Sequence, residues 1–181
     1  MYKILVVVDM QNDFITGALG NQDCKKAVPE VIDIIKTGGY NEIFATRDTH
    51  YENYLETQEG RKLPVPHTQI NTEGWEIQKD IMEAILNTYS KEAMHLIDKS
   101  TFGSTELFDI IKERSARYAE MQIDFVGVCT GICVISNVLP AKMAAPEATV
   151  RVIAKACACV TPESHKTAID AMKMCQVDIV E

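Results

Sequence analysis

The sequence predicts an α/β protein, a three-layer sandwich in which helices cover both faces of a mainly parallel sheet of six strands. Short, continuously apolar segments alternate along the chain with segments of helical spacing. Continuously apolar strands are typical of parallel sheets, because helices bury both of their faces. The 181 residues contain no repeat, low-complexity segment or linker, so we expect a single domain over residues 1–181.

The expected elements follow one another as strand and then helix. The six expected strands span residues 4–8, 42–46, 93–98, 123–128, 149–154 and 177–180. The expected helices span residues 24–37, 75–87, 104–117, 132–144 and 163–175. Ser104 is expected to cap one of them and Pro162 to stand just before the last. Segment 47–74 is long and irregular, which indicates a functional loop.

Composition excludes several classes of partner. The net charge of -8 and the isoelectric point near 5.0 disfavour nucleic acid and anionic membranes. No apolar stretch reaches the roughly 20 residues of a membrane span, and the chain enters its first expected strand at once, so we expect no signal peptide. The six cysteines lack zinc-ribbon spacing. We therefore expect a cytoplasmic protein with reduced thiols. A homo-oligomer is a separate expectation, whose number of subunits the sequence does not give.

Reactive side chains follow four of the expected strands. Asp9 ends the first strand, Asp48 and His50 follow the second, Lys99 follows the third, and a turn carrying Cys133 follows the fourth. Ligands of parallel α/β sheets bind at the carboxyl ends of the strands. Each of these residues taken singly could be an ordinary cap or a solvated charge, but together they predict a site at one edge of the sheet.

The residue types at this edge suit acyl transfer through a thioester. Cys133 is expected at a helix start, where free N–H groups and the helix dipole should lower its pKa. Asp9 could take the thiol proton, Lys99 could offset the two negative charges, and the helix-start N–H groups could hold an oxyanion. The alternative is that Cys133 is a small buried apolar residue, as many free cysteines are.

A second group of residues has the types of a metal site. Asp48 and His50 stand two residues apart at a strand end, and His67 lies on the long loop that follows. Aspartate and histidine are ligands suited to Zn²⁺ or a neighbouring divalent metal. The alternative is that both histidines are loop residues hydrogen-bonded to the backbone. His165 is expected to serve the start of the last helix, His95 to be structural, and Cys157 and Cys159 to be packing residues.

Four ordered motifs resemble those of a known family. They are Asp-Met-Gln-Asn-Asp-Phe at 9–14, Thr-Arg-Asp-Thr-His at 46–50, Lys-Ser-Thr-Phe at 99–102, and Gly-Val-Cys-Thr-Gly-Ile-Cys-Val at 127–134. Through them nearly the whole chain resembles the isochorismatase-like cysteine hydrolases, which include the nicotinamidases. The resemblance implies a Rossmann-like fold and a catalytic triad of Asp9, Lys99 and Cys133. It also implies a cis Val128–Cys129 peptide and an oxyanion hole formed by the N–H groups of Cys129 and Cys133.

The resemblance further implies a substrate and a cofactor. The enzyme would be an amidohydrolase that converts nicotinamide to nicotinate and ammonia, a reaction of NAD metabolism. Phe14 and Phe102 would pack on the substrate ring. Asp48, His50 and His67 would hold a divalent metal, zinc by ligand type, with Glu59 as a fourth ligand in some members.

Two departures from the family pattern bear on these expectations. Gly131 stands where members often have Asp, and Pro64 stands where nicotinamidases tend to have an aromatic residue. Two alternatives therefore stay open: a metal-free member that hydrolyses another carbamoyl or amide compound, and a non-enzymatic binding module. The second is disfavoured because all three triad residues are present. An isochorismate-cleaving enzyme is also disfavoured, because that branch does not use the nucleophilic cysteine.

Overall fold

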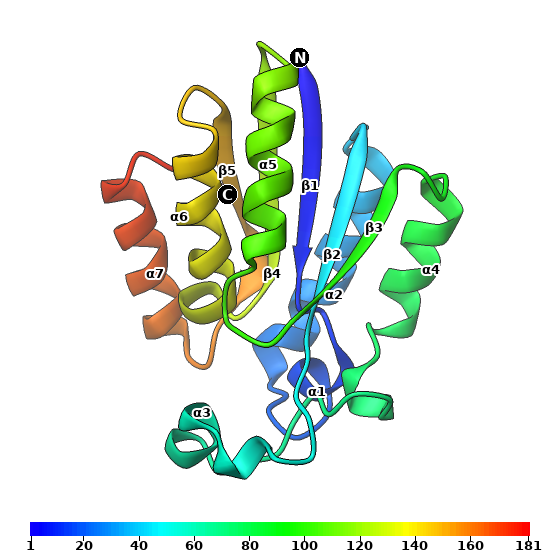
Figure 1. Cartoon of the computed structure of the whole chain (residues 1–181), viewed down its shortest axis with the longest axis vertical. Helices are drawn as coiled ribbons and strands as arrows, with labels where there is room; N and C mark the ends of the chain where they lie inside the picture. Colours follow the sequence, from blue (N-terminus) through cyan, green and yellow to red (C-terminus); the bar gives the residue numbers. More distant parts are fainter.

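A computed structural model describes all 181 residues and contains one six-stranded sheet whose neighbouring strands are all parallel. The strand order is β3-β2-β1-β4-β5-β6 (Figure 1). The strands are β1 (Tyr2–Val8), β2 (Glu42–Asp48), β3 (Met94–Lys99), β4 (Met121–Val128), β5 (Thr149–Ala158) and β6 (Asp178–Val180). The predicted fold class is confirmed, and the sheet is parallel throughout rather than mainly so.

Helices cover both faces of the sheet, as the continuously apolar strands predicted. One face carries α5 (Thr105–Arg117), α6 (Ile135–Ala144) and α7 (Pro162–Met174), and the other carries α2 (Gln22–Thr37) and α4 (Lys79–Thr88). Alternate residues of β1 divide between the two resulting cores: Ile4, Val6 and Val8 pack toward α5 to α7, and Leu5 and Val7 pack toward α2 and α4. Period-two alternation of side chains in a strand accounts for this division.

Several element boundaries differ from the expected ones. The helix expected from residue 75 begins at Lys79, because Trp75 lies in a short 3₁₀ turn (Glu73–Trp75) and its indole N–H donates to Thr49 Oγ1 at 2.9 Å. A short helix, α1 (Asn12–Ile15), was not expected. Strand β5 runs four residues further than expected, to Ala158. The last two differences are accompanied by contacts with distant segments: the Asn12 N–H donates to the Glu76 carbonyl at 3.0 Å, and the end of β5 pairs with Gly127 and Val128 of β4.

The helix ends agree better with the sequence. Ser104 caps α5, where its Oγ accepts a hydrogen bond from the Leu107 N–H at 3.1 Å. Thr161 caps α7 by accepting from the Ser164 N–H, so Pro162 is the first residue of that helix rather than the residue before it. Proline is favoured at this first position because its missing N–H would have no partner there.

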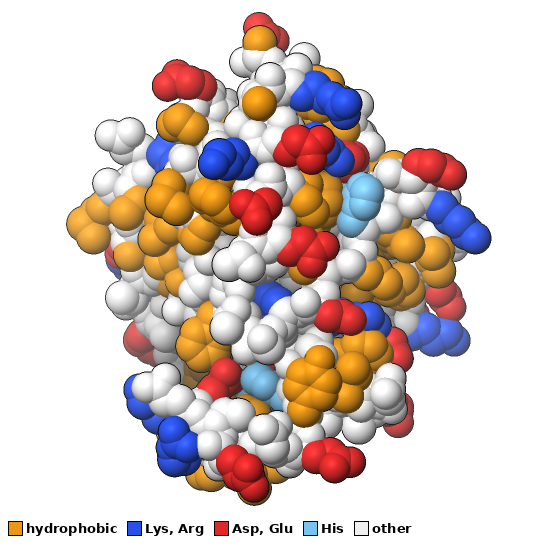
Figure 2. Space-filling model, in the orientation of Figure 1, with side chains coloured by type: hydrophobic (Ala, Val, Ile, Leu, Met, Phe, Trp, Pro, Cys, Tyr) orange, Lys and Arg blue, Asp and Glu red, His pale blue; other side chains and the backbone are white.

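The segment between β2 and α4 folds across the carboxyl edge of the sheet. It contains the short helix α3 (Gln58–Lys62) and a 3₁₀ turn (Tyr54–Glu56), and Figure 1 shows α3 below the ends of the strands. On the face seen in Figure 2, hydrophobic side chains gather over α6 and α7 while charges of both signs are scattered. None of the helices has the length and apolar character that crossing a membrane requires.

Candidate active site

Three reactive side chains meet at the carboxyl edge of the sheet. Asp9 directly follows β1, Lys99 is the last residue of β3, and Cys133 lies in the helical turn after β4. All three are buried, with at most 6% of their surface exposed. Lys99 Nζ lies 2.6 Å from Asp9 Oδ2, in an ion pair. The structure therefore brings together the three residues that the sequence analysis assigned to a triad.

Neighbouring strands hold the Asp9–Lys99 pair in place. Thr46 of β2 donates its hydroxyl to Asp9 Oδ1 at 2.6 Å, and Lys99 Nζ donates to the Thr101 carbonyl at 3.2 Å. Asp9 has a φ of 49°, a left-handed conformation that aspartate tolerates better than most residues. Burial raises the pKa of Asp9 while the Lys99 charge opposes the rise, and the net direction is upward. Burial lowers the pKa of Lys99, but the negative charges of Asp9, Cys133 and Asp48 together outweigh it and the net shift is upward.

The expectation of a lowered pKa at Cys133 is wrong. Burial and the nearby Asp9 carboxylate raise the pKa of this thiol well above its ordinary value, although the Lys99 charge acts in the opposite direction. A helix start stabilises a thiolate only where water or cations compensate for burial, and Cys133 is shielded from water. The resting side chain is therefore a neutral thiol beside a carboxylate that can accept its proton.

The turn that carries Cys133 has an unusual backbone. The Val128–Cys129 peptide is cis, as the resemblance implied, and residues Thr130–Val134 form a π-helical turn before α6. Gly127 has a φ of 119°, and a Cβ atom there would collide with the backbone of Val8. The Cys129 N–H donates to no backbone or side-chain acceptor of the chain. It is a free donor beside the cavity that Cys129 and Cys133 line.

Two contacts that the sequence analysis did not predict stabilise this turn. Asn137 Nδ2 donates to the Cys133 carbonyl at 2.7 Å and to the Phe102 carbonyl at 3.1 Å. Thr130 Oγ1 and His165 Nδ1 share a hydrogen bond of 2.8 Å, although His165 was expected to serve the start of α7. Because α7 lies far along the chain, only the packed structure could show that His165 meets this turn.

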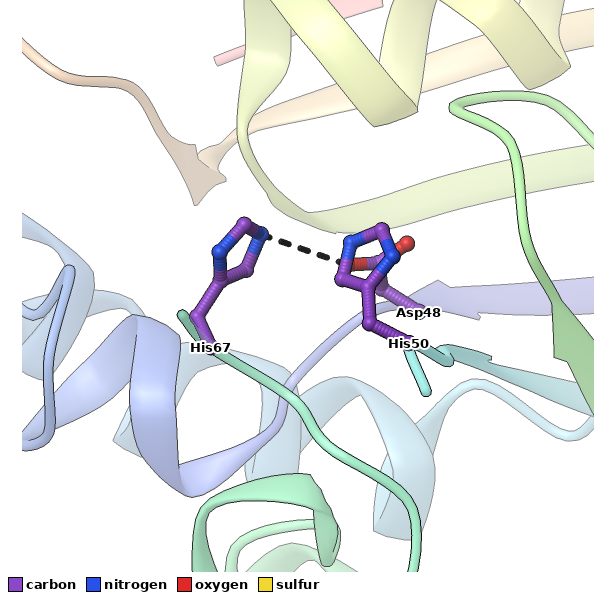
Figure 3. A group of neighbouring side chains, drawn as sticks. All are labelled: Asp48, His50 and His67. Carbon is purple, nitrogen blue, oxygen red and sulfur yellow. Dashed lines mark ion pairs between the residues drawn. The ribbon is translucent and has the colours of Figure 1, made fainter. Parts of the chain in front are cut away.

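Asp48, His50 and His67 form the second group at this edge. All three are buried, and their ligand atoms lie within 4.8 Å of one another. Asp48 Oδ2 is 2.9 Å from His50 Nε2 and 3.5 Å from His67 Nε2. Figure 3 shows His67 reaching toward Asp48 from the loop, with His50 beside Asp48 at the end of β2. Asp48 Oδ1 also lies 3.8 Å from Lys99 Nζ, so the two groups are adjacent.

The details of this group fit a divalent metal. His67 Nδ1 lies 2.8 Å from the Val65 carbonyl, which can only accept, so Nδ1 donates there and Nε2 is the ring nitrogen that faces Asp48. His50 Nε2 is buried and makes no hydrogen bond, and its close neighbour is Asp48 Oδ2 at 2.9 Å. Glu59 Oε1 lies 3.5 Å from His50 Nε2 and 3.9 Å from His67 Nε2, within reach of a fourth ligand position. A buried ring nitrogen without a hydrogen-bond partner is expected where a histidine binds a metal ion through that nitrogen.

Two residues of the first motif hold the metal-ligand loop, and the sequence analysis gave them no role. Gln11 is fully buried, accepts from the Asp48 N–H at 2.7 Å and donates to the Asp48 and Trp75 carbonyls. Asp13 Oδ2 accepts from the Thr68 N–H at 2.7 Å, next to His67. The sequence shows only that Gln11 and Asp13 are polar residues just after an expected strand. The residues with which they form hydrogen bonds lie more than 35 positions away along the chain.

Phe14 and Phe102, expected to contact a substrate ring, both line the cavity above Cys133. The Phe14 ring meets the His67 ring edge-on, with 5.5 Å between centroids. Cys157 and Cys159 are buried, as expected of packing residues, and His95 stacks on Phe44 at 4.6 Å.

Fold and site together define a parallel α/β protein with a buried thiol, carboxylate and ammonium group at one edge of its sheet. The isochorismatase domain family matches residues 3–181, and the chain belongs to this family. A comparison with curated proteins finds no match.

Solved structures of similar fold include nicotinamidases, pyrazinamidases and an isochorismatase-like hydrolase. The nicotinamidase of Bacillus subtilis is 21% identical, with all of both chains covered and a TM-score of 0.85. The pyrazinamidase of Pyrococcus horikoshii, in complex with zinc, is 28% identical, with 100% of this chain and 99% of that chain covered and a TM-score of 0.78. The yeast nicotinamidase is 17% identical, with 98% and 99% covered and a TM-score of 0.78. The family and these neighbours support an amidohydrolase enzyme.

Proposed function

We propose that the protein is a cysteine amidohydrolase that cleaves the C–N bond of a small amide through a thioester, with nicotinamide as the substrate and nicotinate and ammonia as the products. The observation that carries the proposal is the buried Asp9–Lys99 ion pair beside the Cys133 thiol. Buried charges and nucleophiles are costly to a fold, and their gathering in a cleft is typical of a catalytic centre.

The three residues divide the chemistry of the first half-reaction. Asp9 accepts the proton from Cys133 Sγ as the sulfur attacks the amide carbon, and the raised pKa of Asp9 suits it to this transfer. The C–N bond then breaks, and Asp9 returns the proton to the leaving nitrogen, so that ammonia departs. Lys99 stays charged and stabilises the single negative charge of the pair, on the Asp9 carboxylate before the proton transfer and on the Cys133 thiolate after it.

The turn stabilises the negative oxygen, and water completes the reaction. The free N–H of Cys129, together with that of Cys133, is proposed to donate to the carbonyl oxygen as it becomes an oxyanion. Water then attacks the thioester carbon, Asp9 accepts a water proton, and the Cys133 thiol is released with the carboxylic acid product.

Asp48, His50 and His67 would hold a divalent ion, and their ligand types favour zinc. Glu59, which lies beside His50, would be a fourth ligand. When bound, the ion would supply a Lewis-acid position that orients a substrate nitrogen. Phe14 would support the substrate ring from beside His67, and Phe102 would do so from the cavity mouth.

Ammonia release from nicotinamide tests the proposed function. The wild-type protein should release ammonia, and Cys133→Ala should release none while keeping its circular dichroism spectrum. Cys175→Ser, which changes an exposed thiol away from the site, is the matched control and should keep full activity. Mass spectrometry of protein quenched during turnover should find the nicotinoyl group on the peptide that contains Cys133. Turnover by Cys133→Ala would contradict the assignment of the nucleophile.

A further inference from the structure

A large cavity opens above Cys133, between the carboxyl edge of the sheet and α3. Its volume is about 530 Å³, and Asp48, His67 and Cys133 all line it. For comparison, an apolar cavity of about 150 Å³ holds benzene, and an ion with three waters takes on the order of 100 Å³ at ~30 Å³ per water. A single carboxamide ring together with a metal ion would therefore leave a large part of this cavity unfilled.

Three exposed apolar side chains line the cavity, beside the exposed polar residues Gln58, Ser100 and Thr101. Leu63 follows α3, Phe102 lies between β3 and α5, and Val160 lies between β5 and α7, and all three line the cavity. Their exposed fractions are 38%, 46% and 64%. A single exposed apolar side chain is ordinary, but three from separate segments around one opening form a surface that a ligand can cover.

The cavity is lined by few charged residues. Asp48 and Glu59 belong to the metal-ligand group, and Lys62, exposed on α3, is the other charged residue at the opening. Further in, Leu19 and Ile132 continue the apolar lining. An uncharged, apolar group fits this surface better than a charged one, because a buried charge without a partner is costly.

We propose that the preferred substrate is an amide that carries a second apolar group, about the size of another ring, beyond the ring that bears the carboxamide. The carboxamide lies at Cys133, and the added group lies against Leu63, Phe102 and Val160. The inference rests on the proposed amidohydrolase function and specifies its substrate class. Remote apolar contacts of this kind raise kcat/KM because they hold the reacting group in place.

The first experiment measures ammonia release from nicotinamide and from a set of phenyl-substituted nicotinamides, which are isomers of one another with the phenyl group on each free ring carbon in turn. At least one isomer should have a kcat/KM about tenfold or more above that of nicotinamide, since a single methylene in an apolar pocket is already worth roughly 10- to 200-fold. If nicotinamide is hydrolysed and every isomer is equal or worse, this inference is overturned and the proposed function stands. If no amide of the set is hydrolysed, the proposed function fails and the inference fails with it.

The second experiment locates the added group. Leu63→Ser and Val160→Ser should each lower the ratio of kcat/KM for the best isomer to kcat/KM for nicotinamide by about fivefold to tenfold. The ratio is used because a loss of folded protein lowers both values equally. Met143→Ser is the matched control, since Met143 is 70% exposed on α6 and lies outside the cavity. An unchanged ratio in both mouth variants would overturn the placement of the group at this surface.

Discussion

The two groups of the candidate site lie side by side but are built differently. Asp9 and Lys99 stand at the ends of β1 and β3, and Cys133 stands in the turn directly after β4. In the metal-ligand group, only Asp48 stands on a strand. His50 and His67 belong to the long segment between β2 and α4, where the His50 N–H donates to the Thr68 carbonyl at 3.0 Å.

The difference shows which parts of the site the sheet itself positions. Parallel register sets Val8 beside Thr46 and Asp48 beside Lys99, so the ends of β1, β2 and β3 bring the Asp9–Lys99 pair together. The ligand histidines instead depend on Gln11 and Asp13, which fasten the loop to the end of β1. We therefore expect substitutions in the triad to affect the chemical step, and substitutions in the loop to affect metal and substrate binding.

Among variants that keep the Cys133 nucleophile, the largest effect is expected from Asp9→Asn. Loss of the general base should lower kcat by about 10²- to 10⁴-fold, while the metal content stays at the wild-type level. Steady-state kinetics and elemental analysis of the same preparation measure the two quantities, with Asp170→Asn, an exposed substitution on α7, as control. A variant that stays folded and keeps kcat within tenfold of the wild type would remove Asp9 from the base role.

A smaller effect, of a different kind, is expected from His67→Ala. The bound ion should be lost and KM for nicotinamide should rise by about tenfold or more, because loss of a ligand removes substrate orientation rather than the nucleophile. His95→Ala, which removes a histidine from outside the site, is the matched control for metal content. A wild-type protein that carries no metal and still hydrolyses nicotinamide would refute the metal assignment.

Asp13→Ala should weaken metal binding without removing a ligand. The substitution deletes the acceptor of the Thr68 N–H and frees the loop beside His67, so the metal dissociation constant should rise by about tenfold. Competition with a metal-binding dye measures the constant. Asp23→Ala, at the exposed start of α2, provides the control. If metal affinity is unchanged, other contacts hold the loop. The proposed difference between the triad, which the strands position, and the metal ligands, which Gln11 and Asp13 position, is then contradicted for Asp13.

The smallest effect is expected from Thr46→Val. The Thr46 hydroxyl lowers the pKa of Asp9 against the upward effect of burial, so its removal should raise that pKa further. The carboxylate is the active form, and kcat/KM is lost as pH falls through the pKa of Asp9. The acid limb of the pH profile should therefore move to higher pH, with a loss of a few-fold in kcat/KM on that limb. An acid limb that stays in place or moves to lower pH would contradict the role of this hydrogen bond.

Much of the site could be predicted from the sequence because strand ends are easy to recognise. A continuously apolar run such as residues 4–8 ends where a polar residue appears, and parallel topology then sends Asp9, Asp48 and Lys99 to one edge. The residue types alone suggested which chemistry these side chains could perform. The triad and ligand roles remain predictions, but the proximity on which they depend is present in the structure.

What the sequence could not supply were properties that depend on neighbours distant along the chain. Local spacing indicated a helix start at Cys133 and hence a lowered pKa, whereas burial and Asp9 raise it. The same limit applies to His165, which reaches Thr130 from α7, and to Trp75, which the contact with Thr49 keeps out of α4. The sequence by itself determined the fold class and the edge where reactive side chains gather, because hydrophobic periodicity is a local property. Only the tertiary structure decided the protonation of Cys133, the course of the ligand loop and the size of the cavity, because desolvation and long-range contacts exist only once the chain has packed.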